Sequence, residues 1–151
     1  MKLFGYGEKL IQMIRTLYQG ATSCIINNGY TTSRFQIGRS CRQGDCVSPY
    51  LFLLIIEPLL CKLRQILPPI QTTKGPCSTV FAYADDCNCV ALTKRQLRKC
   101  LEALDQYAKF SGLEINKEKS EIMPLPDWRT EQPDLMGIQI VNKIKITGTI
   151  V

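Results

Sequence analysis

The residues best suited to chemistry in this chain are two adjacent carboxylates, Asp85 and Asp86, within the segment STVFAYADDCNCVAL at residues 78–92. Two ionised carboxylates in contact repel each other, so the pair is unfavourable unless water or a cation absorbs its charge. Mg²⁺ prefers one or two protein carboxylates together with water and phosphate oxygens, and two such ions can clamp the oxygens of a phosphoryl transfer. Asp is also a common residue of solvated turns, which is the alternative interpretation. The apolar flank VFAYA favours the metal site, because it predicts that the surroundings of the turn are buried.

The composition excludes several other catalytic chemistries. The chain has no histidine and therefore no Ser-His-Asp or Cys-His machinery. Its 8 cysteines include no Cys-x-x-Cys pair, so the usual zinc-finger spacings are absent. We expect buried, reduced thiols in an intracellular protein, nuclear or cytoplasmic and not secreted, because the N-terminus MKLFGYGEKLIQ has no sustained apolar stretch. The most apolar run, YLFLLIIEPLL, is too short to span a bilayer, so no membrane is expected as a partner.

Length and net charge limit the number of domains and the kind of partner that the chain can have. At 151 residues the chain is one domain or part of a larger one, and its 45% hydrophobic residues can form a core. The net charge of +6 suits a polyanionic partner such as nucleic acid, although many soluble proteins are equally basic.

The elements that must position the aspartates begin with a helix and a hairpin. Apolar side chains at helical spacing predict a helix over residues 8–18, with Gly20 as its stop. Roughly alternating residues on either side of Asn28-Gly29 predict a hairpin, because that dipeptide favours a two-residue turn. The residues that form the apolar face of the helix are Leu10, Ile11, Ile14, Leu17 and Tyr18.

A long apolar helix and a loop are expected next. Ser48 is the predicted N-cap, with Pro49 as the first helical residue. Pro58 should kink this helix, or end it and start a second one. The segment PPIQTTKGPCS, residues 68–78, is predicted to be a loop.

The aspartates themselves are expected at the tip of a tight hairpin, since only they separate the strand candidates TVFAYA and CNCVAL. Thr93 and Gln96 predict a capping box for a helix that ends at Gly112. The residues expected to be buried on that helix are Leu97, Leu101, Leu104 and Ala108.

The last part of the chain is expected to add strands. LEINKEKSEIM predicts a strand with a basic turn, PLPDWRTEQPD a proline-rich surface loop, and LMGIQIVNKIKITGTIV one or two terminal strands. This order of elements predicts an α+β fold, in which an antiparallel sheet carries helices packed on one face.

Several blocks of the sequence resemble reverse transcriptases, in the same order and spacing. FAYADDCNCVAL is similar to the Tyr/Phe-x-Asp-Asp catalytic hairpin of that family, and RSCRQGDCVSPYLFLLIIEPL resembles the Arg-Gln-Gly-Asp-Pro-x-Ser-Pro-x-x-Phe block of non-LTR (LINE-type) retrotransposon and group II intron enzymes. SGLEINKEKSEIM resembles the Gly-Leu-x-x-Asn-x-x-Lys-Ser/Thr segment, and LMGIQI resembles the Leu-Gly-Ile primer grip. FGYGEKLIQMIRTLYQGATSCIINNGY matches the LINE-type pattern before the Arg-Gln-Gly block. The resemblance covers nearly the whole chain and implies that residues 1–151 are a partial reverse transcriptase domain.

The resemblance also implies a polymerase palm and roles for particular residues. Asp85 and Asp86 match the aspartates that bind two Mg²⁺ or Mn²⁺ ions, and Asp85 is the direct ligand expected to matter most. Tyr83 matches the aromatic position beside the primer end, and Lys119 the lysine proposed to protonate the departing pyrophosphate. The implied partners are an RNA template, a DNA primer and a dNTP. The residues that match the loop lying against the incoming nucleotide and its templating base are Arg42, Gln43 and Gly44.

The chain departs from the family pattern mainly by an absence. The first catalytic block, an Asp followed closely by Ala-Phe-Asp or similar, should lie upstream of FGYG, and the fingers and thumb segments of the parent polyprotein are missing as well. Two-metal chemistry needs a third carboxylate. We therefore expect an RNA-directed DNA polymerase by family that is inactive as this chain alone. The alternative is a non-catalytic retroelement remnant with at most weak nucleic-acid binding.

Overall fold

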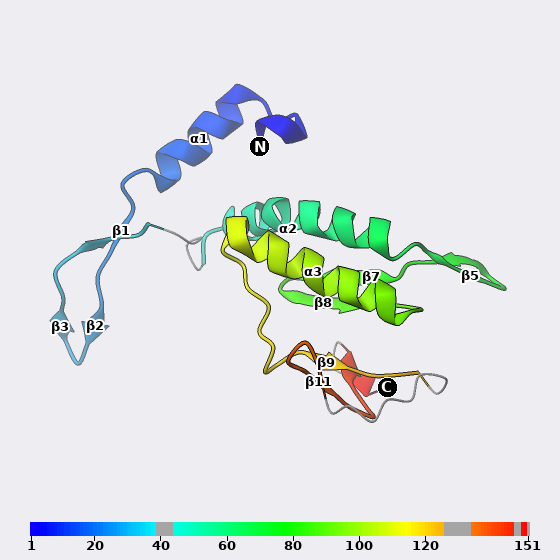
Figure 1. The fold of residues 1–151 in the computed structure, drawn as a ribbon. Coiled ribbons are helices and arrows are strands. Elements are labelled where there is room, and N and C mark those ends of the chain that lie inside the picture. Colours follow the sequence, from blue (N-terminus) through cyan, green and yellow to red (C-terminus); the bar gives the residue numbers. More distant parts are fainter. Residues whose placement is uncertain (39–43, 126–133, 147–148, 151) are drawn as a thin grey trace. The chain divides into compact units, whose positions relative to one another are not determined.

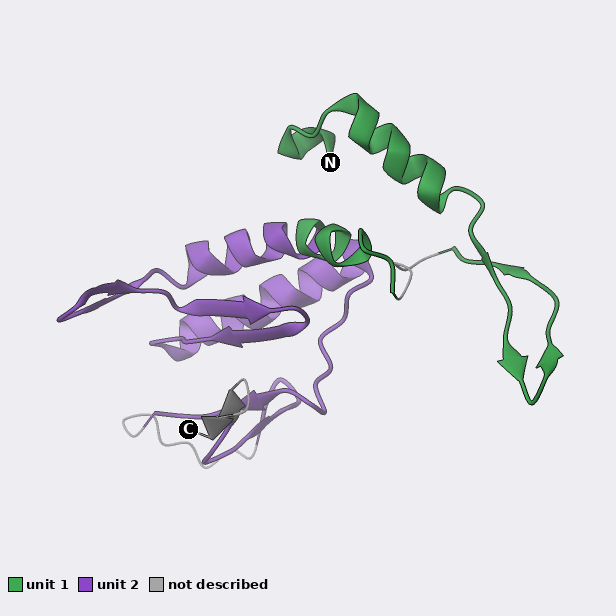
Figure 2. Ribbon diagram, turned by 180° about the vertical axis from the view of Figure 1, so that it is seen from behind, with its two compact units in different colours: residues 1–54 green, residues 55–151 purple. Residues whose placement is uncertain are grey.

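The computed structural model of the protein describes residues 1–38, 44–125, 134–146 and 149–150. Three helices of more than ten residues and many short strands alternate along the chain, which confirms the predicted α+β class (Figure 1). The chain divides into two compact units, residues 1–54 and residues 55–151 (Figure 2).

The first unit contains the predicted helix and hairpin. Helix α1 covers Glu8–Tyr18, as expected from its periodicity, and follows a short 3-10 helix, η1, at Lys2–Phe4. Asn28 and Gly29 both have positive φ, 50° and 82°, as the two central residues of a type I′ turn require. The strands form two antiparallel pairs, β1 (Thr22–Ser23) with β4 (Phe35–Gln36) and β2 (Ile26–Asn27) with β3 (Tyr30–Thr31).

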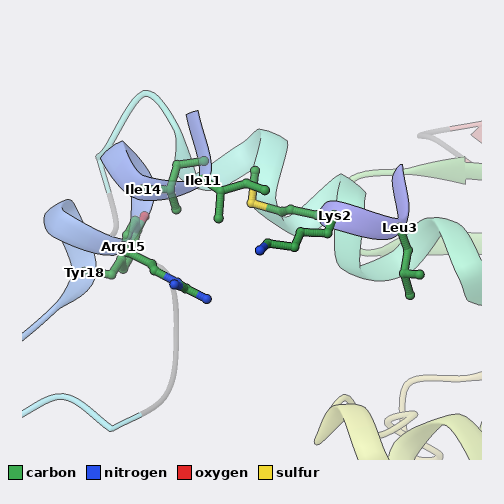
Figure 3. A pocket seen from close by; sticks show the side chains of 7 residues that line it. Lys2, Leu3, Ile11, Ile14, Arg15 and Tyr18 are labelled. Carbon is green, nitrogen blue, oxygen red and sulfur yellow. The ribbon is translucent and has the colours of Figure 1, made fainter. Parts of the chain in front are cut away.

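Helix α1 is less buried than its sequence predicts. Of its described residues only Ile11 is buried, while Leu10 and Leu17 are 42% and 47% exposed. Lys2 and Glu8 form an exposed ion pair of 3.1 Å that joins η1 to the start of α1. An open, mainly apolar hollow of about 510 Å³ lies along the two helices, and its lining contains none of the predicted site residues (Figure 3).

The long apolar helix is continuous. Helix α2 covers Ser48–Ile66, so it starts one residue earlier than predicted and Pro58 does not end it. Pro58 cannot donate a backbone hydrogen bond, and its neighbours Ile56, Leu59 and Leu60 are buried. Burial of that apolar face compensates for the missing bond.

In the second unit a two-stranded ribbon lies against the helix pair formed by α2 and α3. The ribbon consists of β7 (Val80–Tyr83) and β8 (Asp86–Cys89), and the two views of the molecule place it on one side of both helices (Figures 1 and 2). Leu63 and Leu67 are the most completely buried side chains, at 0% and 1% exposed. The Thr79 hydroxyl donates to the carbonyl of Leu67 at 2.6 Å, which fixes the chain at the start of the ribbon.

Helix α3 has the predicted ends. It covers Lys94–Ser111, the Thr93 hydroxyl accepts from the amide of Gln96 at 3.1 Å, and Gly112 has the left-handed conformation of a helix stop. The Gln96 side chain accepts from the amide of Leu92 at 3.0 Å, which completes the capping arrangement. The Tyr107 hydroxyl donates to the carbonyl of Ile55 and so joins α3 to α2. The buried residues of α3 are Cys100, Leu101, Ala103 and Tyr107.

The segment 68–78, predicted as a loop, is a hairpin. Strands β5 (Ile70–Thr72) and β6 (Gly75–Cys77) pair antiparallel. The Thr72 hydroxyl donates to the carbonyl of Gly75 at 2.7 Å and accepts from the amide of Lys74 at 3.3 Å. These side-chain bonds close a turn that has no strong signal in the sequence, which is why the prediction was wrong.

The strands do not join into the single sheet that was expected. Among the described residues they form six small sheets of two or three strands, and strands of two to four residues make few ladder bonds each. One pair, β9 with β11, is parallel rather than antiparallel. The C-terminal strands are β9 (Glu121–Ile122), β10 (Asp134–Leu135), β11 (Ile138–Ile140), β12 (Lys145–Ile146) and β13 (Thr149–Ile150). The proline-rich loop predicted between β9 and β10 lies largely outside the described residues.

Two further expectations concern cysteines and membranes. The described cysteines are all free thiols, as predicted, but only Cys100 is buried, so the expectation of buried thiols was wrong for most of them. Cys77, Cys87 and Cys89 lie on short strands, Cys61 lies on an exposed side of α2, and Cys24 and Cys46 lie outside helices and strands. Among the described helices none is long and apolar enough to cross a bilayer.

The position of Leu63 at the centre of the second unit makes a stability prediction. We expect Leu63→Ala to lower the free energy of unfolding by about 2–5 kcal/mol, because it removes buried methyl groups and leaves a cavity. Leu53→Ala is the matched control on the same helix, since that side chain is 51% exposed. Urea unfolding measured by circular dichroism checks both, and equal losses in the two variants would contradict the assigned core.

Candidate active site

The predicted catalytic hairpin is present, with a different turn from the one expected. Tyr83 pairs with Asp86 in the ladder of β7 and β8, so the two-residue turn consists of Ala84 and Asp85. Asp86 is therefore the first residue of β8 rather than the second residue of the turn. Asp85 lies at the tip, and its neighbour begins a strand whose direction is fixed by the ladder.

The ladder register separates the ribbon into two faces. Directly opposed residues share a face, so Tyr83 and Asp86 lie together, with Phe81 and Asn88 behind them. Tyr83 is 76% exposed and Phe81 48%, so this face is open. The expectation that the VFAYA flank buries the turn was therefore wrong for these two aromatics. A uniformly apolar run suggests burial of every side chain, whereas strand alternation buries Val80 (5% exposed) and turns the aromatics outward.

The backbone at the turn is strained. Ala84 has a φ of 50°, in a region that L-residues other than Asn and Asp rarely adopt. A positive φ at the first central residue is the pattern of type II′ turns, where glycine is preferred. A non-glycine residue in this conformation is unfavourable by about 1 kcal/mol or more, and such strain is concentrated at functional sites. Asp85 lies on this strained turn and Asp86 begins the strand after it, and both residues are exposed.

The two carboxylates fit a partial magnesium site. Their oxygens are hard ligands, accessible to water and to phosphate, and no described basic side chain forms an ion pair with them. In the described part of the chain no group of three or more His, Cys, Asp or Glu side chains comes together, so the pair has no third acidic partner there. The hairpin can thus supply two carboxylates to a metal centre, and the remaining ligands must come from elsewhere.

The other face of the ribbon carries a pair of thiols. The sulfur atoms of Cys87 and Cys89 lie 3.9 Å apart, and this contact lowers the pKa of Cys87 to about 7, against the smaller opposing effect of desolvation. The same contact, together with desolvation, raises the pKa of Cys89. Desolvation also raises the pKa of Cys100, on α3, to about 11. Both thiols lie on the ribbon face opposite Tyr83 and Asp86, and both are exposed.

The loop before α2 holds the next group of predicted residues. Gly44 has a φ of 80°, which an L-residue adopts only with strain, so the loop requires glycine there. Arg42 and Gln43 lie outside the described residues. Gly44 belongs to the first unit, and Tyr83, Asp85 and Asp86 belong to the hairpin in the second unit.

A hydrogen-bonded group without a counterpart in the sequence predictions anchors this loop. The Tyr18 hydroxyl donates to the Asp45 carboxylate at 3.0 Å and lies 2.9 Å from the hydroxyl of Ser48. The other carboxylate oxygen of Asp45 accepts from the amide of Val47 at 3.1 Å. The sequence predicts Tyr18 on the apolar face of α1 and Ser48 as a cap, and their hydroxyls give no signal of a contact across 30 positions. The end of α1 is thereby tied to the start of α2.

Lys119 lies in the turn before β9. Its amide donates to the carbonyl of Asn116 and to the side-chain oxygen of the same residue, both at 3.2 Å. Its side chain is exposed and makes no hydrogen bond or ion pair with the other described residues. The structure therefore contains no contact between Lys119 and the aspartate hairpin within its described part.

Comparison with known proteins identifies the class. The sequence profile of the family "Reverse transcriptase (RNA-dependent DNA polymerase)" matches residues 1–149. This match spans nearly the whole chain and includes the aspartate hairpin, the loop at Gly44 and the turn at Lys119. The chain belongs to the reverse transcriptase family, and the resemblance drawn from its sequence blocks is confirmed.

The relatives are retrotransposon proteins. The chain is 32% identical over 121 residues to the Transposon TX1 uncharacterized 149 kDa protein of Xenopus laevis, covering 80% of this chain and 9% of that protein. It is 27% identical over 120 residues to the Pol polyprotein from the type-2 retrotransposable element R2DM of Drosophila melanogaster. This match covers 79% of this chain and 11% of that protein. A Pol polyprotein from the type-1 retrotransposable element R2 of Popillia japonica is 26% identical over 119 residues. This match covers 79% of this chain and 20% of that protein. These similarities are to non-LTR elements, and the chain spans only a small part of each relative's length.

The strained turn gives a stability prediction. We expect Ala84→Gly to raise the free energy of unfolding by about 1 kcal/mol, because glycine adopts a positive φ without strain. Ala82→Gly is the control in the middle of the same strand, paired with Cys87, and should destabilise by about 0.5–1 kcal/mol. Chemical unfolding of the two variants side by side checks this, and a loss in both would mean that Ala84 is not strained.

The hydroxyl of Tyr18 gives a prediction about the loop. Tyr18→Phe removes its bonds to Asp45 and Ser48, worth about 1 kcal/mol at a half-buried position. We expect faster hydrogen exchange at the amides of Val47 and Ser48, measured by mass spectrometry of peptides from residues 44–54. Tyr30→Phe is the control, because Tyr30 is 83% exposed on the β2–β3 hairpin. Unchanged exchange in the Tyr18 variant would show that the hydroxyl does not hold the loop.

Proposed function

We propose that residues 1–151 are the palm core of an RNA-directed DNA polymerase from a non-LTR retrotransposon, extending from just after the first catalytic block to the primer grip. The observation that supports this most is the exposed turn that presents the carboxylates of Asp85 and Asp86, in a chain whose family match spans residues 1–149. A structural hairpin would not need two adjacent like charges beside a strained Ala84. The protein acts inside the cell, in the nucleus or cytoplasm, where its substrates are.

The proposed reaction joins a dNTP to the 3′-hydroxyl of a DNA primer on an RNA template. The primer oxygen forms a bond to the α-phosphorus, and the bond to pyrophosphate breaks. Asp85 and Asp86 would hold two Mg²⁺ or Mn²⁺ ions, which when bound would offset the charge that develops on the attacking and leaving oxygens. Tyr83, which lies on the same ribbon face as Asp86, would contact the primer end. Lys119 would protonate the departing pyrophosphate.

The loop before α2 would contact the nucleotide. Arg42, Gln43 and Gly44 are proposed to lie against the incoming dNTP and its templating base. The proposed contact is supported by the left-handed conformation of Gly44, where an added Cβ would meet no atom of the described residues within 4 Å, so the backbone there is open to approach by a ligand. The bonds from Tyr18 and Val47 to Asp45 would keep this loop in position during the reaction.

We infer further that residues 1–151 alone do not synthesise DNA. Two-metal transfer needs a third carboxylate, and none joins Asp85 and Asp86 among the described residues. Segments like the family's first catalytic block, fingers and thumb would have to complete the enzyme. The same observation favours a second candidate, a non-catalytic retroelement remnant that binds nucleic acid at most weakly.

Primer extension tests both candidates. We expect no incorporation of dTTP on poly(rA)/oligo(dT) with Mg²⁺ by residues 1–151, and incorporation by a chain extended upstream with a block that carries the third carboxylate. Activity of residues 1–151 alone would contradict the incomplete site, and inactivity of the extended chain would favour the remnant.

Asp85→Asn in the extended chain tests the role of the turn. We expect loss of synthesis by at least about 10³-fold, since a metal ligand is removed, with a thermal midpoint that is unchanged or slightly higher because a like-charge repulsion is relieved. Glu102→Gln, an exposed residue on α3, is the control for the charge change and should retain activity. Unfolding of the Asp85 variant would mean that the turn is structural.

A further inference from the structure

The first two turns of α3 carry a dense group of cations. Lys94, Arg95, Arg98 and Lys99 lie within six residues, all are exposed, and the first turn contains no acidic residue. Acidic residues are favoured at this end of a helix because its dipole is positive, and cations there are unfavourable. Thr93 and Gln96 cap this end of the helix, so the four cations lie on a well-formed helical turn rather than on a frayed end.

Three of these cations form a patch on the outer side of the helix. Arg95, Arg98 and Lys99 follow helical spacing, and the buried residues of the helix begin after them, at Cys100 and Leu101. None of the three makes an ion pair with a described residue, although Glu102 follows at the spacing of a helical pair. The described part of the chain therefore does not neutralise this charge. We refer to these three side chains as the α3 basic patch.

The patch is separate from the catalytic face of the ribbon. The ribbon packs on the helices through the side of Val80, and Asp86 and Tyr83 lie on its other, open side. The patch belongs to α3, on which its three side chains are exposed, and the ribbon of β7 and β8 is a separate element (Figures 1 and 2). A primer end held at Asp85 is thus not the group that neutralises it.

We propose that the α3 basic patch binds the phosphate backbone of a single-stranded nucleic acid, at a second contact outside the catalytic hairpin. From Arg95 to Lys99 the helix rises by about 6 Å, and the rise per nucleotide of one strand in duplex DNA is about 3.4 Å, so the patch spans roughly two nucleotide steps, or three phosphates. Arg is suited to phosphate because its fork of donors can bind two oxygens. The contact is to the backbone and carries no sequence preference. It needs neither metal nor the aspartates, so it goes beyond the proposed polymerase chemistry.

The test compares two triple variants that remove equal charge. The first is Arg95→Gln, Arg98→Gln and Lys99→Gln, and the second is Lys62→Gln, Lys74→Gln and Lys109→Gln, three exposed cations elsewhere in the same unit. Binding of a fluorescent 20-nucleotide single-stranded RNA to residues 1–151 is measured by anisotropy in EDTA, over a series of salt concentrations. The same measurement with a single-stranded DNA of equal length shows whether the patch binds the RNA backbone, the DNA backbone or both.

For the patch variant we expect binding that is at least tenfold weaker at about 100 mM salt. We also expect the slope of log K against log salt concentration to be smaller in magnitude by about 2, because each of three lost phosphate contacts contributes about 0.7. For the other variant we expect less than a threefold change. Arg95→Lys with Arg98→Lys keeps the charge and should retain most of the binding, and thermal melting verifies that each variant is folded.

Equal losses in the two triple variants would overturn the proposal, because they would show an effect of net charge alone. A Glu-rich peptide that binds the unchanged chain as tightly as RNA, and loses binding in the patch variant, would overturn it in favour of an acidic protein partner. Tighter binding of RNA than DNA would identify the RNA strand as the ligand, and equal binding would leave the shared backbone as the ligand.

Discussion

The arrangement of the candidate site depends on the register of one short ladder, that of β7 with β8. Pairing of Tyr83 with Asp86 limits the turn to two residues, which forces Ala84 to a positive φ and places Asp85 at the tip. A shift by one residue would exchange the two faces, burying Asp86 and exposing Val80. Burial of Val80 and the bond from Thr79 to the carbonyl of Leu67 oppose that shift. The core under the ribbon therefore fixes which carboxylates face outward.

The elements that could be predicted are those whose signals are local. The capping residues Thr93 and Gln96, the stop at Gly112 and the periodicity between them define α3 without reference to the rest of the chain. The Asn28-Gly29 turn was predictable for the same reason, since both of its residues tolerate positive φ. The type of fold and the family followed from such local elements and from the order of the sequence blocks.

What could not be predicted depends on contacts between distant residues. The Tyr18 hydroxyl meets Asp45 and Ser48 across 27 and 30 positions, and nothing in the local pattern of α1 separates a bonded tyrosine from an apolar one. The hairpin of β5 and β6 depends on a threonine side chain closing an ordinary turn. The exposed aromatics of β7 follow from which strand face the helices cover, and the parallel pairing of β9 with β11 joins segments separated by the whole proline-rich region.

The proposed chemistry depends on the binding of a divalent cation by Asp85 and Asp86. Titration of Mn²⁺ into ¹⁵N-labelled protein, followed by paramagnetic line broadening, tests this directly and needs no enzymatic activity. We predict that the amide signals of residues 83–87 broaden first, and that the effect is lost in the Asp85→Asn, Asp86→Asn double variant. First broadening elsewhere, with the signals of the hairpin unaffected at the same Mn²⁺ concentration, would contradict cation binding at this turn.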